Sequence, residues 1–304
     1  MIPARHPPPA RPGDRVGVAA LSGPVDPERL ARGLAALEGL GFVPVPADNL
    51  ASRSGNGFFA GTDAERLAAF HRLAADPSVA AILFARGGHG MLRVLPGIDW
   101  DLLARRPRAY MGFSDLTPFL LGVVARLGLV AFHGPMVAAD LARGLSEIEE
   151  ESFLGALAGR YPATQPLGRP LRSSPASGPL LGGCLSLLAA TLGTPFAADL
   201  SGSLVFWEDV GEPPYRIDRM LTHLRLSGSL SKIAGMIVGH ISAGTGDNVT
   251  SADWPAVVGE ALSGFSWPIA WGQESGHVAP NRTLPLGLGT RLSSDATRLV
   301  LGEG

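Results

Sequence analysis

The stretch RAYMGFSDLTPFLLGVV (residues 108–124) joins a strand-like run to a helix-like run through a sharp turn. Tyr110 lies in the β-prone run, Gly112 follows it, and an apolar helical run begins just after Ser114 and Asp115. A serine at such a turn is commonly a helix N-cap. It can also act as a nucleophile, because backbone amides at a helix N-terminus can stabilise an oxyanion. The stretch predicts a strand–turn–helix unit and leaves both roles open.

The same alternation continues on both sides of this unit. Asp26-Pro27 supplies an N-cap followed by proline at the first helical position, and Thr62 with Glu65 forms a capping box that opens another helix. Alternating strands and helices predict an α/β fold, with a parallel sheet covered by helices over roughly the first 140 residues. The expected strands are RVGVAAL (15–21), FVPVPA (42–47), VAAILFA (79–85) and GLVAFHGP (128–135).

The pattern breaks at RYPATQPLGRPLRSSPASGP (160–179), a segment rich in proline, glycine and serine. Such a composition predicts an interdomain linker lying on the surface. We therefore expect an N-terminal domain over 1–145, a connecting helix and linker over 146–178, and a C-terminal domain over 179–304. Within the last, the sequence predicts helices at 182–193 and 215–228, strands at 203–210 and 233–241, and short strands in the tail.

Composition narrows the class of protein. The chain has 304 residues, of which 46% are apolar and 17% charged, with a net charge of −2, which is typical of a globular protein with no general attraction to nucleic acid or anionic membranes. No apolar stretch approaches the ~20 residues that span a bilayer, and the N-terminus does not resemble a secretory signal. The cytoplasm is the expected compartment. The single cysteine and the spacing of the histidines predict no metal site.

Three further segments carry candidate chemistry. ARGGHG (85–90) follows a buried strand, and its glycines would let the backbone approach an anion, or form only a flexible turn. FWEDVGEPPYRIDR (206–219) places Glu208 and Asp209 at a strand end, where they face opposite sides, within what could also be a salt-bridged loop. His277 lies in a glycine-containing loop, where a lone histidine is more often structural than catalytic. Because Leu116 replaces the second glycine of G-x-S-x-G, the α/β-hydrolase motif is not matched.

Taken together and in this order, these segments resemble the LD-carboxypeptidases of serine peptidase family S66, which include the microcin C immunity hydrolases. The resemblance extends over nearly the whole chain. Each matching segment alone is weak evidence for the family, whereas the six segments in this order are specific for it. The matching blocks are FAGTDAERL, ARGGHG, MGFSDLT, GLVAFHGPM, FWEDVGEPPYRIDRMLTHLRLSG and GQESGHVAPNRTLPLG.

The resemblance implies a Ser-Glu-His triad of Ser114, Glu208 and His277, with oxyanion amides from Gly88 and Asp115. It also implies an N-terminal flavodoxin-like domain similar to class I glutamine amidotransferases, a C-terminal swivelling β/β/α-type domain and a homodimer. Two positions depart from the family pattern. His89 stands where a tyrosine is usual in the glycine loop, and Cys184 stands where asparagine is frequent.

The implied activity is removal of a C-terminal D-amino acid, D-alanine, from a murein tetrapeptide through an acyl-enzyme, without cofactor, metal or nucleic acid. The penultimate residue, diaminopimelate or lysine, stays open. One alternative is hydrolysis of a peptidyl or aminoacyl sulfamoyl-adenylate, with Trp207 or Trp271 stacking on the base. A second is a non-catalytic small-ligand binding protein. The candidate substrate contacts are Arg86, Gly87, His89 and Arg216, the two arginines because a guanidinium pairs bidentately with a carboxylate.

Overall fold

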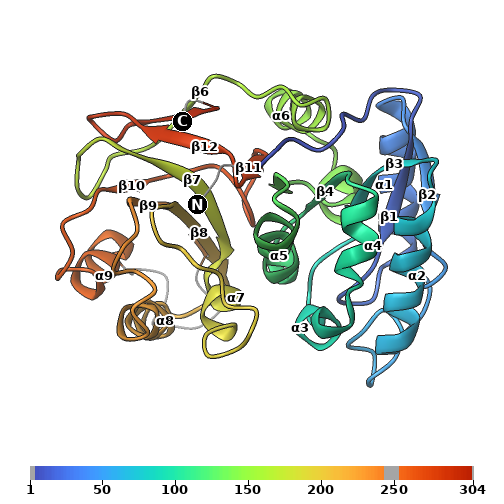
Figure 1. The fold of residues 1–304 in the computed structure, drawn as a ribbon, viewed down its shortest axis with the longest axis horizontal. Helices are drawn as coiled ribbons and strands as arrows, with labels where there is room; N and C mark the ends of the chain where they lie inside the picture. The colour runs from blue at the N-terminus through green and yellow to red at the C-terminus, as the bar shows by residue number, and fades with distance from the viewer. Residues whose placement is uncertain (1–3, 243–252, 303–304) are drawn as a thin grey trace.

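The computed structural model describes residues 4–242 and 253–302, which form two sheets lying side by side (Figure 1). The first sheet has the order β11-β5-β4-β3-β1-β2, in which the five strands of the N-terminal half are parallel and β11 is an antiparallel edge. Its strands are β1 (Arg15–Ala19), β2 (Val43–Pro46), β3 (Val79–Phe84), β4 (Ala109–Gly112), β5 (Ala131–His133) and β11 (Leu284–Leu286). The predicted parallel sheet is confirmed.

The helices around the first sheet begin where the sequence signals them. Asp26 caps the first helix by accepting a hydrogen bond from the Arg29 N–H, and Thr62 and Glu65 form the predicted capping box. The helices are α1 (Pro27–Gly39), α2 (Asp63–Ala75), α3 (Met91–Val94), α4 (Trp100–Arg105), α5 (Thr117–Leu127) and α6 (Glu147–Leu157), with a π-helix at Val137–Leu141.

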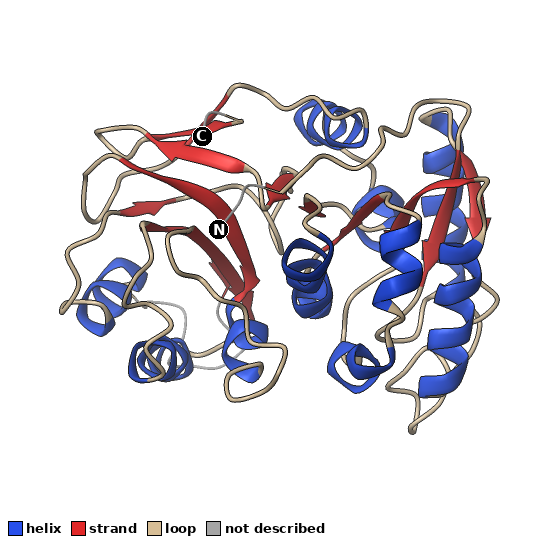
Figure 2. Cartoon of the chain, in the orientation of Figure 1, coloured by secondary structure: helices blue, strands red, loops and turns tan. Residues whose placement is uncertain are grey.

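The second sheet has the order β10-β9-β8-β7-β12-β13-β6, parallel from β7 to β10 and antiparallel beyond. Helices α8 and α9 pack together beside it (Figure 2). The molecule is thus a mixed α/β protein with a parallel sheet in its N-terminal part and a second sheet domain. The elements are β6 (Thr164–Pro166), β7 (Ala176–Cys184), α7 (Leu185–Ala190), β8 (Leu204–Val210), α8 (Pro214–Leu226), β9 (Gly235–Ser242), α9 (Trp254–Ala261), β10 (Ile269–Trp271), β12 (Gly289–Leu292) and β13 (Arg298–Leu301).

Two local predictions were wrong. The segment 160–179 is not only a surface linker, because it contains β6 and the start of β7, and Gln165 is buried. Proline is tolerated there because β6 is an edge strand. The helix expected from residue 182 begins at Leu185, because Gly182 still belongs to β7; a Cβ at Gly182 would lie 1.7 Å from the Phe206 carbonyl oxygen of β8. Glycine here lets the two strands run side by side.

The two sheets meet around α5, which lies between them (Figure 1). At the start of α5 the Thr117 hydroxyl accepts a 3.0 Å hydrogen bond from the Cys184 N–H at the end of β7. A Cβ at Gly183 would lie 2.5 Å from that hydroxyl, so the contact is close. The end of β7 therefore abuts the turn that carries Ser114. Strand β11 lies in sequence between β10 and β12 of the second sheet, yet it extends the first sheet and ties the halves together.

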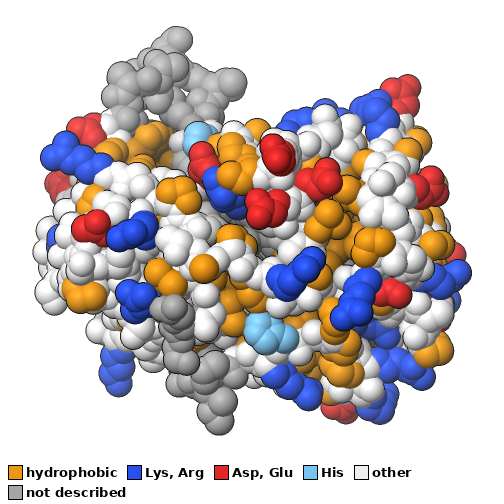
Figure 3. All heavy atoms as spheres, turned by 90° about the horizontal axis from the view of Figure 1, so that it is seen from above, with side chains coloured by type: hydrophobic (Ala, Val, Ile, Leu, Met, Phe, Trp, Pro, Cys, Tyr) orange, Lys and Arg blue, Asp and Glu red, His pale blue; other side chains and the backbone are white. Residues whose placement is uncertain are grey.

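Acidic and basic side chains are interspersed on the face shown in Figure 3, as expected from the small net charge. None of the helices described over 4–242 and 253–302 has the length and apolarity to cross a bilayer. Within the same ranges, no cluster of three or more histidine, cysteine, aspartate or glutamate residues is arranged to hold a metal ion.

Candidate active site

Ser114 is held on a strained turn between β4 and α5. Its φ is +63°, in the left-handed region that a residue other than glycine rarely adopts. Such strain persists only where the surroundings enforce it, and it is frequent at functional sites. The glycine loop packs directly on this turn, since a Cβ on Gly87 would lie 2.8 Å from the Ser114 Cβ. A side chain at residue 87 would therefore collide with Ser114.

His277 connects Ser114 to a buried carboxylate from the other sheet. Its Nε2 lies 3.1 Å from the Ser114 Oγ, and its Nδ1 lies 2.7 Å from the Glu208 Oε2. The same carboxylate oxygen accepts a hydrogen bond from the His277 backbone N–H at 3.1 Å. Glu208 is fully buried on β8, whereas the His277 side chain is 20% exposed. The three side chains, distant in sequence, form a continuous Ser–His–Glu chain across the domain interface.

Asp209, the neighbour of Glu208, points to the other side of β8. Its carboxylate accepts a 2.7 Å hydrogen bond from the Ser186 N–H at the start of α7. This is the alternation that a strand imposes on successive side chains. Asp209 therefore stabilises the start of a helix, while Glu208 faces His277.

Gly88 lines the same cavity as Ser114, and Asp115 follows Ser114 in the chain. Among the backbone–backbone hydrogen bonds of the described turns and loops, neither amide is a donor. A Cβ on Gly87 would lie 3.4 Å from the Asp115 nitrogen, which places the two segments in contact. The buried Asp115 carboxylate accepts from the Met91 N–H at 2.7 Å, and the Gly23 N–H donates to the Gly87 carbonyl. These bonds fix the glycine loop beside the turn that carries Ser114, the arrangement that an oxyanion site needs.

Two opposing effects set the pKa of His277. Burial lowers the pKa of the ring, while the hydrogen bond and the negative charge of Glu208 raise it by more, with smaller contributions from Asp209 and Asp140. The resulting pKa lies above the ordinary value of 6.5. A base with a raised pKa accepts the serine proton more readily, but it must first be deprotonated.

We expect the acid limb of kcat/KM to have its midpoint above pH 6.5, because protonated His277 cannot act as the base. In Glu208→Gln the raising effect is lost and burial remains, so the limb should move to lower pH. Measuring kcat/KM against pH for both proteins checks this. Lys232→Gln, a change in the loop after α8, is the control and should keep the wild-type profile. A limb that stays in place in Glu208→Gln would mean that another group controls it.

The loop that carries His277 is anchored by a buried network that sequence analysis did not identify. The Gly276 N–H donates to the Asn281 Oδ1, and the Asn281 N–H donates to Glu149, both at 2.7 Å. The Asn281 side-chain amide donates to Asp140 at 3.3 Å. Burial raises the pKa of Glu149, but the hydrogen bonds that its carboxylate accepts from the Asn281 N–H, from Ser146 and from Arg143 lower it by more, so the carboxylate stays charged. A spacing of S-x-x-E from residue 146 reveals the capping role of Glu149, but not its second role.

Phe113 and His133 form the wall behind the ring of His277. The Phe113 ring packs edge-on against His277, with centroids 4.9 Å apart, and also contacts His133 at 5.7 Å. Burial lowers the pKa of His133 to about 4, despite the charge of Glu208. Neither of its ring nitrogens has a hydrogen-bond partner among the described residues. A neutral His133 keeps a competing charge away from the Glu208–His277 pair.

The other sequence candidates divide into two groups. Arg86 and Gly87 line a cavity of about 470 Å³ together with Ser114 and His277. The structure does not bring His89 or Arg216 to this cavity. His89 is exposed and packs on Phe59, with ring centroids 5.6 Å apart. Arg216 lies on the exposed side of α8 and pairs with Glu212 at 3.3 Å. The structure therefore places both side chains outside the cavity that contains Ser114.

The fold and the geometry define a class: a two-sheet α/β protein with a serine, a histidine and a buried carboxylate in hydrogen-bond order, as in serine hydrolases. Two family models match the chain, the LD-carboxypeptidase N-terminal domain over residues 16–134 and the C-terminal domain over 177–292. The chain belongs to the LD-carboxypeptidase family S66, as the resemblance predicted, and is a peptidase-type hydrolase.

Individual relatives cover nearly all of both chains. A putative carboxypeptidase of Streptomyces coelicolor, SCO6489, is 38% identical over 96% of this chain and 95% of its own. The crystal structure of muramoyltetrapeptide carboxypeptidase from Oxalobacter formigenes is 30% identical, with a TM-score of 0.84 over 95% of this chain and 99% of its own. The microcin C7 self-immunity protein MccF of Escherichia coli is 28% identical over 96% of this chain and 94% of its own.

Proposed function

We propose that this protein is a serine LD-carboxypeptidase that removes the C-terminal D-alanine from murein tetrapeptides in peptidoglycan recycling. The observation that carries the proposal is the Ser114–His277–Glu208 chain, with its distances of 3.1 and 2.7 Å. The similarity to a muramoyltetrapeptide carboxypeptidase supports the substrate class. A cytoplasmic location and a homodimer belong to the same proposal, and light scattering on the purified protein tests the second.

In the proposed mechanism His277 takes the Ser114 proton as the hydroxyl oxygen attacks the scissile carbonyl carbon. Glu208 holds the ring with Nδ1–H toward itself and stabilises the imidazolium that forms. The amides of Gly88 and Asp115 bind the negative oxygen of the tetrahedral intermediate, and loss of one such donor typically costs about 3 kcal/mol of transition-state stabilisation. His277 then protonates the leaving amine, D-alanine departs, and water, activated by the same ring, hydrolyses the acyl-serine.

The second candidate function is hydrolysis of aminoacyl sulfamoyl-nucleosides, which the similarity to MccF favours. A stacking surface for the base was expected from Trp207 or Trp271. Trp207 is fully buried, and its indole N–H points to the Met236 sulfur. Trp271 lines a different cavity with His240 and Trp254. Because neither ring lines the cavities beside Ser114, the peptide substrate is the better-supported proposal.

The experiment that tests the proposal compares the two substrate classes on purified protein. We expect release of D-alanine from murein tetrapeptides with diaminopimelate or lysine at the third position, and little cleavage of aspartyl sulfamoyl adenosine. The reverse preference would assign the immunity-type activity instead. Labelling of Ser114 by a fluorophosphonate, located by mass spectrometry, separates both enzymes from a non-catalytic binding protein.

A further inference from the structure

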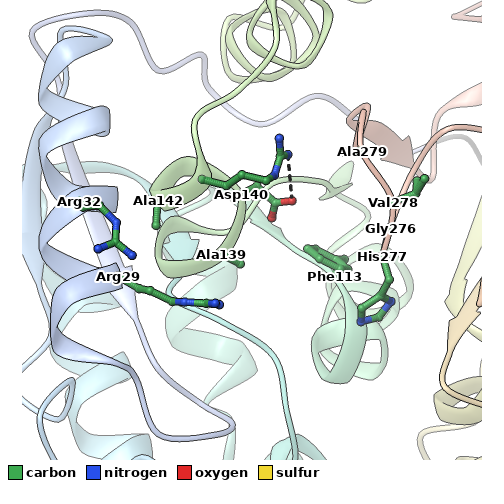
Figure 4. Close-up of a pocket in the computed structure, with 11 residues that line it drawn as sticks. Arg29, Arg32, Phe113, Ala139, Asp140, Ala142, Gly276, His277, Val278 and Ala279 are labelled. Atoms are coloured by element: carbon green, nitrogen blue, oxygen red, sulfur yellow. Dashed lines mark ion pairs between the residues drawn. The ribbon is translucent and has the colours of Figure 1, made fainter. Parts of the chain in front are cut away.

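Beside the cavity that contains Ser114 lies a second cavity with an unusual concentration of arginine. It has a volume of about 440 Å³, and Arg29, Arg32 and Arg143 contribute to its walls. Arg29 and Arg32 project from α1 (Figure 4). The two cavities share Arg29, Phe113, Ala139 and His277, so they are neighbouring parts of one cleft. We refer to the second part, lined by the three arginines, as the arginine cavity.

Arg29 is the arginine with most freedom to bind a ligand. Among the described residues it has no ion pair, and its guanidinium makes no hydrogen bond. It extends from α1 toward Phe113 and His277 (Figure 4). Its position in the first turn of α1 is also unfavourable for a cation, because the helix dipole there prefers a negative charge. Neither local pairing nor helix stability explains an arginine at this position.

The acidic groups beside Arg29 are already satisfied by other donors. Asp26 accepts the backbone N–H of Arg29 as the cap of α1. Asp140 accepts from the Met136 N–H at 2.9 Å and from the Asn281 side chain at 3.3 Å. Three arginines line the cavity against one carboxylate, Asp140, so the lining carries a net positive charge.

Close packing fixes this arrangement. A Cβ on Gly33 would lie 1.9 Å from the Val137 carbonyl oxygen, so only glycine lets α1 approach the π-helix at this distance. Gly33 lies four residues after Arg29, and therefore on the same side of the helix. The facing wall consists of Ala139 and Ala142, whose small side chains leave the space open.

The chemistry of the site decides which part of a substrate reaches the arginine cavity. The acyl carbonyl must lie beside Ser114 and the Gly88 amide, both of which belong to the first cavity and its glycine loop. The leaving amine takes its proton from His277, which lines both cavities. The leaving group therefore extends past His277, away from the glycine loop and toward the arginines.

We propose that Arg29, supported by Arg32 and Arg143 at the rim, binds the terminal carboxylate of the leaving D-amino acid. The inference rests on the carboxypeptidase function proposed above and names the residues that select a free C-terminus. Arg29 is the main contact because Arg143 is already paired with Glu149 at 2.6 Å and with Asp140 at 3.8 Å. Arg86 is less suited, since its guanidinium donates to the Pro24 carbonyl at 3.0 Å.

The test uses two substrates, a murein tetrapeptide with a free C-terminal D-alanine and the same peptide with a D-alanine amide. Wild type should prefer the free carboxylate. Arg29→Gln should lower kcat/KM for the free peptide about 10- to 100-fold, mainly through KM, as expected for loss of a hydrogen-bonded charge. Arg29→Glu should lower it further, and a glutamate in the first turn of α1 suits the helix dipole, so the variant should fold. The ratio of kcat/KM for the free peptide to kcat/KM for the amide should fall in both variants.

Arg105→Ala, an exposed arginine at the end of α4 that lines neither cavity, is the matched control and should keep the wild-type ratio. The rate of fluorophosphonate labelling monitors the triad in each variant. If wild type releases D-alanine and Arg29→Gln keeps the wild-type ratio, this inference is overturned while the carboxypeptidase function stands. If wild type releases no D-alanine from the free peptide, the carboxypeptidase function fails and the inference fails with it.

Discussion

Ser114→Ala is expected to lower kcat for D-alanine release on the order of 10⁵-fold, to the level left by substrate binding and the oxyanion amides. The Ser114 Oγ, 3.1 Å from the His277 Nε2, is the only oxygen of that residue's side chain, so alanine removes the nucleophile and changes little else. Steady-state and single-turnover assays of D-alanine release check the result. Turnover within tenfold of wild type would remove Ser114 from the mechanism.

A matched variant separates loss of chemistry from loss of structure. Ser114→Gly should be as inactive as Ser114→Ala, yet it should unfold at a temperature equal to or higher than that of the alanine variant. The reason is the φ of +63° at this position, which glycine adopts without strain and alanine does not. Thermal unfolding of the two inactive proteins measures the difference. A lower melting temperature for Ser114→Gly would show that the strain at the turn is not relieved as the backbone angle implies.

The sequence predicted the first sheet because its signals are local. Buried apolar runs, the N-cap at Asp26 and the capping box at Thr62 each act within a few residues, and each produced the expected element. Prediction from the sequence failed where a contact between residues distant in the chain determines the conformation. Gly182 extends β7 because it packs against a carbonyl on β8, and Leu284–Leu286 joins a sheet whose other strands lie far earlier in the chain. Neither contact leaves a local pattern.

The site shows the same division. Strand alternation separated Glu208 from Asp209 before any contact was known, and the resemblance to the family indicated which of the two faces the histidine. The network that holds the His277 loop was not predictable, because the sequence pattern around Glu149 indicates only a helix-capping residue. Sequence analysis also did not identify Arg29 as a candidate binding residue. An arginine in the first turn of a helix becomes a candidate only when the residues across the cavity are known. Arg216 was proposed because a guanidinium pairs with a carboxylate, a property of the residue type that does not show where helix α8 turns the side chain.

Asp209→Asn supplies the control for the carboxylate of the triad. Its two carboxylate oxygens accept the N–H groups of Ser186 and Val210, and an asparagine keeps one of these hydrogen bonds through its amide oxygen. We therefore expect Asp209→Asn to retain kcat within about tenfold of wild type, with at most a modest loss of thermal stability. A loss as large as that of a triad residue would mean that Asp209, and not Glu208, supports the histidine.

Glu208→Gln is expected to lower kcat about 10⁴-fold, the loss typical of replacing a triad carboxylate by its amide. The Glu208 Oε2 accepts hydrogen bonds from both the ring Nδ1 and the backbone N–H of His277, at 2.7 and 3.1 Å. An amide that turns its NH₂ toward the ring holds the tautomer whose Nε2 carries the proton, and such a ring cannot accept the serine proton. An amide that turns its oxygen toward the ring keeps the tautomer but carries no charge to stabilise the imidazolium in a buried site. Both orientations slow acylation, so the loss should appear in kcat as well as in kcat/KM, and a variant with wild-type kcat would show that Glu208 is only structural.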